Sequence, residues 1–240
     1  MQPNHNSDYR VISFDLDRTL IFHARSAKQD QVVTLLQAQG LAVTAESYRA
    51  ATHLAREFYD VLGYHYASNP TQLRYDYVQL VLQRLGCGDS QLISRVADFY
   101  QRFDDDPANF YTPPEAKSLL LQLQRGGFQL FAISSNLMAT QRVQHCGLAG
   151  MFQEVLTPVL GVAKAELYRR LIAQSDALPN QVLHVGDDPI LDVLAPQRLG
   201  IHALLFDPDN RYATLPWQHI VRSYTELEQR INAEVGTVQL

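Results

Sequence analysis

The chain of 240 residues has few cysteines, no excess of positive charge and no long apolar run. Its two cysteines, Cys87 and Cys146, lack the spacing of a CxxC or Cys/His metal site, so we expect reduced thiols in a cytoplasmic protein. Lysine and arginine number 20 against 25 acidic residues, and the net charge of -5 argues against a nucleic-acid or anionic-membrane surface. No stretch approaches the roughly 20 apolar residues that span a bilayer. From the charge and the lack of such a stretch, we expect neither nucleic acid nor membrane as a partner.

Short apolar runs that are typical of buried parallel strands alternate with helical patterns along the chain. The clearest runs are VISF at 11–14, FQLFAI at 128–133, QVLHV at 181–185 and IHALLF at 201–206, and a weaker one is FQEVLT at 152–157. Between them, residues 163–173 place apolar side chains at helical spacing, and the pair Gly126 and Gly127 indicates a helix end before a strand. This alternation predicts an α/β fold with a doubly wound, Rossmann-like parallel sheet.

Residues 23–111 interrupt this alternation, because they contain four helical stretches and no convincing strand. The fourth stretch begins after Asp89 and repeats apolar side chains on one face. We therefore predict a helical bundle at 23–111, inserted into a core made of residues 1–22 and 112–240. The acidic run DDDP at 104–107 lies near the return to the core and is interpreted as a solvated turn.

Polar side chains gather where the predicted strands end. They are Asp15 and Asp17 after the first strand, Ser134 and Ser135 after the second, Lys164 at the start of a later helix, and Asp187, Asp188 and Asp192 in the segment GDDPILD. Each one alone has an ordinary explanation as a turn residue, a helix cap or a surface charge. In open α/β sheets, however, ligands bind outside the carboxyl ends of the strands, so their joint occurrence predicts a functional site there.

The chemistry of this set follows from its charges. Converging carboxylates repel one another unless a cation joins them, and a set of oxygen ligands suits Mg²⁺. Together with Lys164, the ion would neutralise an incoming phosphoryl group and support the charge that develops during its transfer. Asp15 can then act as the nucleophile that forms an aspartyl-phosphate. Asp17, clear of the phosphorus, can give a proton to the leaving alcohol and later take one from water.

These residues, in this order, resemble the four motifs of the haloacid dehalogenase-like (HAD) hydrolase superfamily. The resemblance covers nearly the whole chain and rests on DLDRTL, Ser134, Lys164 and GDDPILD, and the helical insertion resembles the C1-type cap domain of that superfamily. It implies that Asp15 is the nucleophile, Asp17 the acid/base, Ser134 and Lys164 phosphoryl ligands, and Asp15, Asp187 and the Asp17 carbonyl the Mg²⁺ ligands. Asp192 is expected to support the metal shell, with Asp188 as a further helper.

Three positions depart from the pattern of that superfamily. Arg18 stands where glycine is frequent in a tight turn, and its side chain either points to solvent or alters substrate access. Ala165 follows the motif lysine in place of the usual proline. The second motif allows two registers, Ser134 with Ser135 or Ser135 with Asn136, and the distance from the preceding glycines favours Ser134.

Asp17 favours phosphate-ester chemistry over dehalogenation, because a halide leaves without a proton and the dehalogenases that resemble this family lack the second aspartate. A phosphonate-cleaving enzyme would need a lysine in the cap domain, where the sequence offers only Lys28. A phosphomutase and a catalytically inactive binding protein of the same fold stay open as alternatives. We therefore predict Mg²⁺-dependent hydrolysis of a small phosphomonoester, such as a sugar phosphate or nucleoside monophosphate, with the oligomeric state left open.

The substrate is expected between the core and the cap domain. Candidate contacts from the cap domain are His23, Arg25, His53, Arg56, Tyr59, Tyr64, His65, Arg74 and Tyr75, although a solvated or packing role explains each one alone. Arg25 and Arg56 would suit a second anionic group on the substrate. His184 lies inside a predicted strand and is interpreted as a packed histidine.

Overall fold

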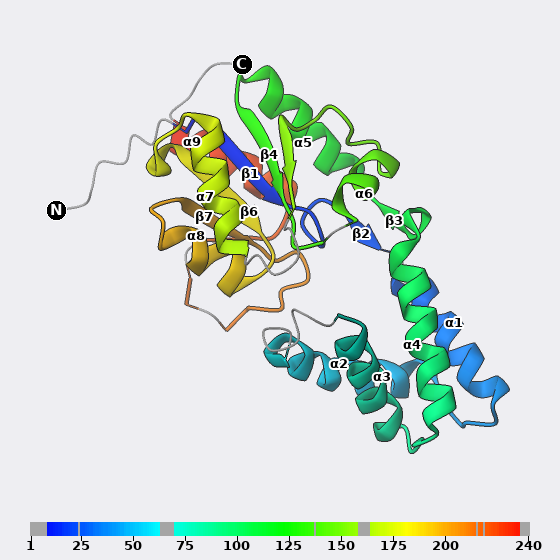
Figure 1. The fold of residues 1–240 in the computed structure, drawn as a ribbon. Coiled ribbons are helices and arrows are strands. Elements are labelled where there is room, and N and C mark those ends of the chain that lie inside the picture. The colour runs from blue at the N-terminus through cyan, green and yellow to red at the C-terminus, as the bar shows by residue number, and fades with distance from the viewer. Residues whose placement is uncertain are drawn as a thin grey trace. The chain divides into compact units, whose positions relative to one another are not determined.

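The computed structural model describes residues 9–23, 25–62, 70–136, 138–157, 164–214, 216–217 and 219–235 (Figure 1). The chain divides into two compact units. One, which we call the α/β unit, comprises Met1–Phe22 and Phe110–Leu240, and the other, the helical unit, comprises His23–Asn109. The helical unit ends two residues before the end of the insertion predicted at 23–111.

A sheet of six parallel strands forms the centre of the α/β unit (Figure 1). In spatial order the strands are β5 (Glu154–Leu156), β4 (Gln129–Ile133), β1 (Val11–Asp15), β6 (Val182–Gly186), β7 (His202–Phe206) and β8 (Ile220–Val221). Val11 of β1 aligns with Gln129 of β4 on one side and with Val182 of β6 on the other. The predicted doubly wound parallel sheet is confirmed. Strand β8 was not predicted, because two residues are too few to show a period.

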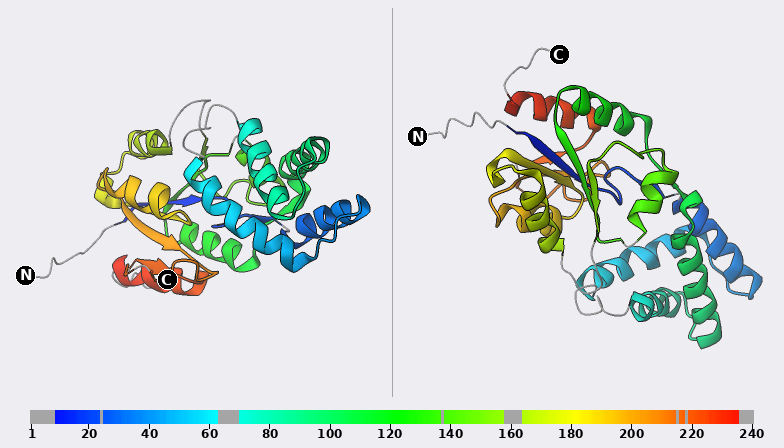
Figure 2. Two further views of the ribbon diagram at one scale, coloured as in Figure 1. Left: turned by 90° about the horizontal axis from the view of Figure 1, so that it is seen from below. Right: turned by 45° about the horizontal axis from the view of Figure 1, so that its top comes forward.

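Helices cover both faces of this sheet (Figure 2). They are α5 (Pro114–Arg125), α6 (Ala139–His145), α7 (Lys164–Ser175), α8 (Ala195–Gln197) and α9 (Tyr224–Val235), with the 3-10 turn η2 (Pro179–Gln181) and the π-helical turn η3 (Pro189–Leu194). Side chains of β1 alternate between the two faces. Phe14 joins the buried cluster that contains Leu120 of α5 and Leu227 of α9. Val11 joins the cluster that contains Leu167 of α7, so both faces of the strand are buried.

The helical unit has its own core. Its helices are α1 (Arg25–Ala38), α2 (Ala45–Leu62), α3 (Pro70–Arg84) and α4 (Ser90–Asp105), followed by the 3-10 turn η1 (Pro107–Asn109). Leu36, Tyr48 and Leu82 are among the side chains that the packed helices bury. The predicted start of α4 is confirmed, because the carboxylate of Asp89 accepts hydrogen bonds from the first backbone N–H groups of that helix.

Two predictions for residues 23–111 need correction. The short strands β2 (Phe22–His23) and β3 (Phe110–Tyr111) pair with each other, so the expectation of no strand in this range is wrong. Strands of two residues leave no alternation for a sequence pattern to detect. The acidic run is also more than a solvated turn, because Asp104 forms an ion pair with Lys28 at 2.8 Å.

Several further features bear on the predictions. No helix in the described part of the chain has both the length and the apolar character needed to cross a bilayer. Both cysteines are buried and free. Of the candidate substrate contacts, Tyr64 and His65 lie outside the described residues, and only the helical backbone is described for Arg25, Arg56 and Tyr59.

Candidate active site

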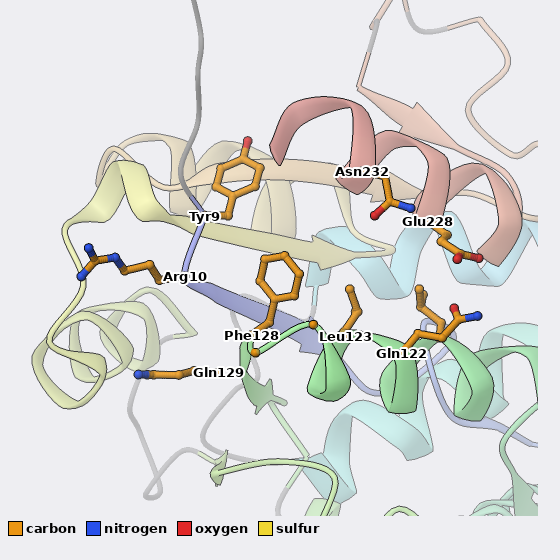
Figure 3. A pocket seen from close by; sticks show the side chains of 11 residues that line it. Tyr9, Arg10, Gln122, Leu123, Phe128, Gln129, Glu228 and Asn232 are labelled. Carbon is orange, nitrogen blue, oxygen red and sulfur yellow. The ribbon is translucent and has the colours of Figure 1, made fainter. Parts of the chain in front are cut away.

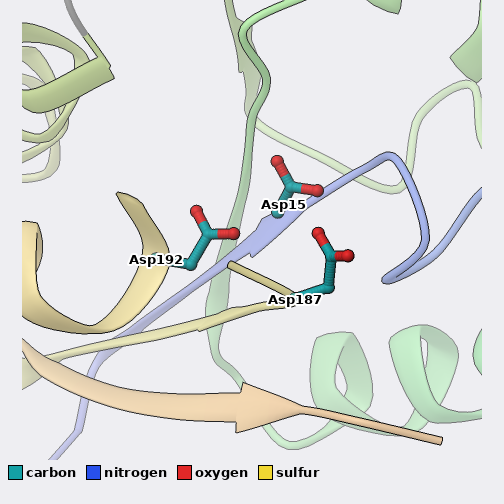
Figure 4. Close-up of side chains that lie close together, drawn as sticks. All are labelled: Asp15, Asp187 and Asp192. Carbon is teal, nitrogen blue, oxygen red and sulfur yellow. The ribbon is translucent and has the colours of Figure 1, made fainter. Parts of the chain in front are cut away.

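Three carboxylates converge at the carboxyl ends of two neighbouring strands (Figure 4). Asp15 is the last residue of β1, Asp187 directly follows β6, and Asp192 lies in the turn η3 beyond it. Because β1 and β6 are parallel neighbours, their carboxyl ends meet at the same edge of the sheet. One oxygen atom from each of the three carboxylates lies within 4.8 Å of the others. This is the arrangement expected of a cation site built from oxygen ligands.

Lys164 supplies the positive charge at this cluster. It is the first residue of α7, and its Nζ lies 2.5 Å from Asp15 Oδ1 and 2.6 Å from Asp192 Oδ1. Only 5% of its side chain is exposed. Burial would lower the pKa of Lys164, but the carboxylates of Asp15 and Asp192 outweigh burial and raise this pKa above its usual value. The lysine is therefore a permanent cation between two carboxylates.

Asp192 is the most firmly held member of the cluster. Its Oδ1 also lies 3.2 Å from the hydroxyl of Tyr168 and 3.3 Å from Nε2 of His184, and its Oδ2 accepts a hydrogen bond from the backbone N–H of Asp188. Burial favours the neutral carboxyl, yet the charge of Lys164 and the hydrogen bond with His184 hold the pKa of Asp192 below its usual value. Asp192 is therefore ionised and oriented from several sides.

His184 is a buried partner of this network. Its Nδ1 is 2.9 Å from the hydroxyl of Ser13, and its ring packs edge-on against Tyr168 with 4.8 Å between the ring centroids. Burial lowers the pKa of His184. The imidazole is thus neutral near pH 7, and it contacts and orients Asp192 from strand β6.

The pKa values of Asp15 and Asp187 are raised, whereas that of Asp192 is lowered. Burial raises the pKa of Asp15 well above its usual value, and although Lys164 opposes this shift, the charges of Asp192 and Asp187 add to it. Burial and then the charge of Asp192 raise the pKa of Asp187 to about 6. A divalent cation would relieve this repulsion. The donor set, which contains three carboxylates and neither thiolate nor imidazole, fits Mg²⁺.

Arg18 turns toward the cluster and not toward solvent. Its Nε lies 3.2 Å from Asp187 Oδ2, and 13% of its side chain is exposed. Nη2 of Arg211 approaches the same carboxylate oxygen at 2.9 Å. The backbone of Arg18 has a φ of 68°, the left-handed conformation that glycine adopts without penalty. The backbone at this position therefore has the conformation that favours glycine, as the sequence pattern suggested. The structure also shows that the Arg18 side chain pairs with Asp187.

The side chains of the other two predicted metal residues have partners outside the group of three carboxylates. The Asp188 carboxylate caps the turn η3, because its Oδ1 accepts hydrogen bonds at 2.8 Å from the backbone N–H groups of both Ile190 and Leu191. The Asp17 side chain, which is 39% exposed, forms an ion pair with Arg142, whose Nη1 lies 2.6 Å from Asp17 Oδ1. The structure thus separates the two aspartates of the first motif, which have different partners.

The two serines at the end of β4 differ in burial. Ser134 is 1% exposed, and its Oγ accepts a hydrogen bond from the backbone N–H of Asn136 at 3.1 Å. Ser135 is exposed. Ile133 of β4 aligns with Asp15 of β1, so Ser134 follows directly beside the end of that strand. This placement agrees with the register that puts Ser134 at the site.

Sequence reasoning did not single out Arg142 and Arg211, which pair with Asp17 and Asp187. Arg142 is separated from Asp17 by 125 positions, and nothing local in the sequence marks it as a partner. Asn136 was considered only as an alternative member of the second motif, although its amide Nδ2 lies 3.3 Å from Asp17 Oδ2. The signal that could have found it is its position at the end of a predicted strand.

A cavity of about 310 Å³ lies at the other ends of the strands (Figure 3). Tyr9 and Arg10, which precede β1, line it together with Phe128 and Gln129 at the start of β4. Glu228 of α9 also lines it. Since the carboxylates lie at the carboxyl ends of the same strands, this cavity is separate from their site.

The comparisons with known proteins agree with the geometry of the site. The family profile of the haloacid dehalogenase-like hydrolases matches residues 9–200. This chain belongs to the HAD-like hydrolases. The resemblance inferred from the motifs is therefore confirmed at the level of the superfamily, and the chain is a HAD-like hydrolase by family.

Relatives and solved structures extend over nearly the whole chain. Haloacid dehalogenase-like hydrolase domain-containing protein 3 of Xenopus laevis is 26% identical, over 91% of this chain and 93% of the relative. The magnesium-bound HAD hydrolase YfnB of Bacillus subtilis has a TM-score of 0.69 at 18% identity, over 93% of this chain and 99% of that one. A predicted phosphoglycolate phosphatase from Haemophilus somnus has a TM-score of 0.63 at 16% identity, over 93% and 98% of the two chains. Dehalogenases are also among the similar structures, so likeness of fold does not choose between the two reactions.

Proposed function

We propose that this HAD-like hydrolase is a cytoplasmic, Mg²⁺-dependent phosphatase that hydrolyses a small phosphomonoester through an aspartyl-phosphate intermediate. The observation that carries the proposal is the different surroundings of Asp15 and Asp17. Asp15 is buried against Lys164 in the carboxylate cluster, whereas Asp17 is partly exposed and held by Arg142. Two nearby carboxylates in different environments suit two different tasks, one as nucleophile and one as acid/base.

In the proposed reaction, Asp15 attacks the phosphorus of the ester and the bond from phosphorus to the leaving oxygen breaks. Asp17 gives its proton to that oxygen, so the product leaves as a neutral alcohol. Asp17 then takes a proton from water, whose oxygen attacks the phosphorus of the aspartyl-phosphate and releases phosphate and free Asp15. Splitting the displacement in this way returns both aspartates to their starting state.

The remaining residues are proposed to bind and orient. Lys164, Ser134 and the exposed Ser135 are the proposed ligands of the phosphoryl oxygens. The Mg²⁺ would be held by Asp15, Asp187, Asp192 and the backbone carbonyl of Asp17, with Asp188 acting only through the turn that it caps. When bound, the metal neutralises the charge that collects on the phosphoryl oxygens. The helical unit is proposed to serve as the C1-type cap domain that selects the substrate, a sugar phosphate or nucleoside monophosphate.

The alternative reactions have less support. A dehalogenase releases halide and has no use for the proton that Asp17 would supply. A phosphonate-cleaving enzyme would need a free amine, but Lys28 pairs with Asp104 at 2.8 Å and lies over the ring of Tyr100, 4.0 Å from its centroid. Its contacts are those of a packing residue within the helical unit. A phosphomutase would use the same aspartates, and the assay below distinguishes it.

The test is phosphate release from a panel of phosphorylated metabolites, with Mg²⁺ and with a chelator, for the wild type and Asp15→Asn. Asp176→Asn is the matched control, because Asp176 is exposed, follows the far end of α7 from Lys164, and has a φ of 52° that asparagine tolerates. We expect release that requires both Mg²⁺ and Asp15, with the control at wild-type activity. Undiminished release by Asp15→Asn would refute the assignment of the nucleophile. Transfer of phosphate between positions of one substrate, without its release, would favour the mutase.

A further inference from the structure

The guanidinium of Arg142 is buried beside the proposed acid/base. Arg142 lies in α6 and is 6% exposed, with its Nη1 2.6 Å from Asp17 Oδ1. The guanidinium carbon stacks 3.7 Å from the centroid of the Phe110 ring. A planar guanidinium that stacks on a ring and donates to a carboxylate has little freedom to move. Arg142 therefore presents its hydrogen bond from a fixed position.

A second donor holds the other oxygen of the same carboxylate. The side-chain Oδ1 of Asn136 accepts a hydrogen bond from the backbone N–H of Met138 at 2.9 Å, so its Nδ2 is the group that faces Asp17 Oδ2 at 3.3 Å. The backbone N–H of Asn136 in turn donates to Ser134 Oγ at 3.1 Å. Arg142 of α6 and Asn136, just before that helix, thus contact one oxygen of Asp17 each, and Asn136 is itself tied to the end of β4.

Each of the two aspartates has its own cation. Lys164 contacts Asp15 at 2.5 Å and Arg142 contacts Asp17 at 2.6 Å. The cations come from different helices, α7 and α6, so the contacts that hold the Asp17 side chain differ from those that hold the carboxylate cluster. Proton transfer requires the acid/base to lie within hydrogen-bond reach of the leaving oxygen, and small misplacements cost rate.

We infer that Arg142 is a positioning residue for Asp17, assisted by Asn136, and that it acts on proton transfer to the leaving group. This inference rests on the proposed function, in which Asp17 is the acid/base. None of the four motifs that mark the superfamily in this chain contains Arg142. Its role follows from its burial, its stacking on Phe110 and its contact with one oxygen of Asp17.

The test compares two esters that differ in leaving group. Loss of a positioned acid should slow an alkyl phosphate, whose alkoxide leaves poorly, far more than 4-nitrophenyl phosphate, which needs little protonation. For Arg142→Met we expect kcat/KM, which reports on the step that releases the alcohol, to fall at least ~30-fold for the alkyl ester and less than ~3-fold for the aryl ester. Loss of the acid/base itself typically costs about 10²- to 10⁴-fold in rate, so the loss for the alkyl ester should approach that range. Arg142→Lys, which keeps the charge, should recover part of the loss for the alkyl ester.

Two controls separate positioning from simple support of the fold. Arg169→Met removes the same charge from an exposed ion pair with Glu166 and should leave both rates unchanged. In an Asp17→Asn background, Arg142→Met should add no further loss, because a residue that acts through Asp17 has nothing left to position. If Arg142→Met does not fold, Asn136→Ala tests the same idea, with a smaller loss that is again confined to the alkyl ester.

The outcomes are distinguishable from failure of the proposed function. If the wild type releases no phosphate, or releases it without Asp15, the proposed function itself fails. If the wild type is an Asp15-dependent phosphatase but Arg142→Met lowers kcat/KM equally for both esters, or adds its full loss to Asp17→Asn, the inference about Arg142 is wrong and the residue is structural.

Discussion

Gly186 lies so close to Asp192 that a Cβ atom at position 186 would come within 2.3 Å of the Asp192 carboxyl carbon. Gly186 is the last residue of β6, and Asp192 comes back over it from the turn η3. The close approach is possible only because glycine has no side chain. It brings Asp192 next to Lys164 and Asp15.

Gly186→Ala should therefore displace Asp192 and disorganise the carboxylate cluster. We expect a loss of about 1–3 kcal/mol in the free energy of unfolding, as for other overpacked sites, together with weaker Mg²⁺ binding. Chemical denaturation and calorimetric titration with Mg²⁺ measure the two effects. Gly88→Ala is the matched control, because no atom lies within 4 Å of its Cβ position and its φ is not positive. Wild-type Mg²⁺ affinity in Gly186→Ala would show that the turn can move aside without consequence.

Lys164→Met should leave Asp15 and Asp192 buried without their shared cation. Removing one partner of a buried ion pair typically costs about 3–5 kcal/mol, because the remaining charge has lost its compensation. We expect a lower melting temperature in chelator and a larger rise on addition of Mg²⁺ than in the wild type, since the metal replaces the missing charge. Thermal unfolding with and without Mg²⁺ tests this. The half-buried Lys117 provides the control Lys117→Met, and an equal response to Mg²⁺ in all three proteins would contradict the prediction.

Arg18→Gly should change metal binding through Asp187. The variant removes a positive charge 3.2 Å from Asp187 Oδ2 and places glycine at a φ of 68°, where a side chain costs about 1 kcal/mol or more. Without that charge the carboxylate is freer to bind a cation, so we expect Mg²⁺ to bind several-fold more tightly in calorimetric titration. Arg18→Lys, which keeps the charge, should stay near the wild-type affinity. Weaker binding in Arg18→Gly would mean that Arg18 orders Asp187 for the metal and does not compete with it.

Asp17→Asn should lower the free energy of unfolding as well as the rate of the reaction. The substitution deprives the buried Arg142 of its charged partner, which should cost about 1–3 kcal/mol of stability. Adding Arg142→Met to this variant should recover part of that loss, because the unpaired charge is then gone. Urea denaturation of the two single variants and the double variant measures this coupling. Additive losses would show that the ion pair contributes nothing to the folded state.

The local pattern of the sequence was sufficient for the elements that carry the site. Buried strands such as β1 and β6 consist of short apolar runs, and α7 begins at Lys164 as its helical pattern indicated. Such patterns depend only on residues that are neighbours in the sequence. The superfamily could be identified because the order of its motifs along the chain is likewise a property of the sequence. The two-residue strands β2, β3 and β8 were not predicted, because they are too short to show an alternating pattern.

The tertiary structure decided which charges meet. By sequence alone, the aspartates at the strand ends could be assigned roles but not side-chain partners, and the structure shows that Asp17 pairs with Arg142 and that Asp188 caps a turn. Strand order and helix packing bring together residues more than 100 positions apart, such as Asp17 and Arg142, and no local pattern encodes those distances. The sequence by itself therefore determined the fold class and the candidate residues. Their partners, and with them the division of the aspartates into a cluster and a separately paired Asp17, follow only from the packing of the chain.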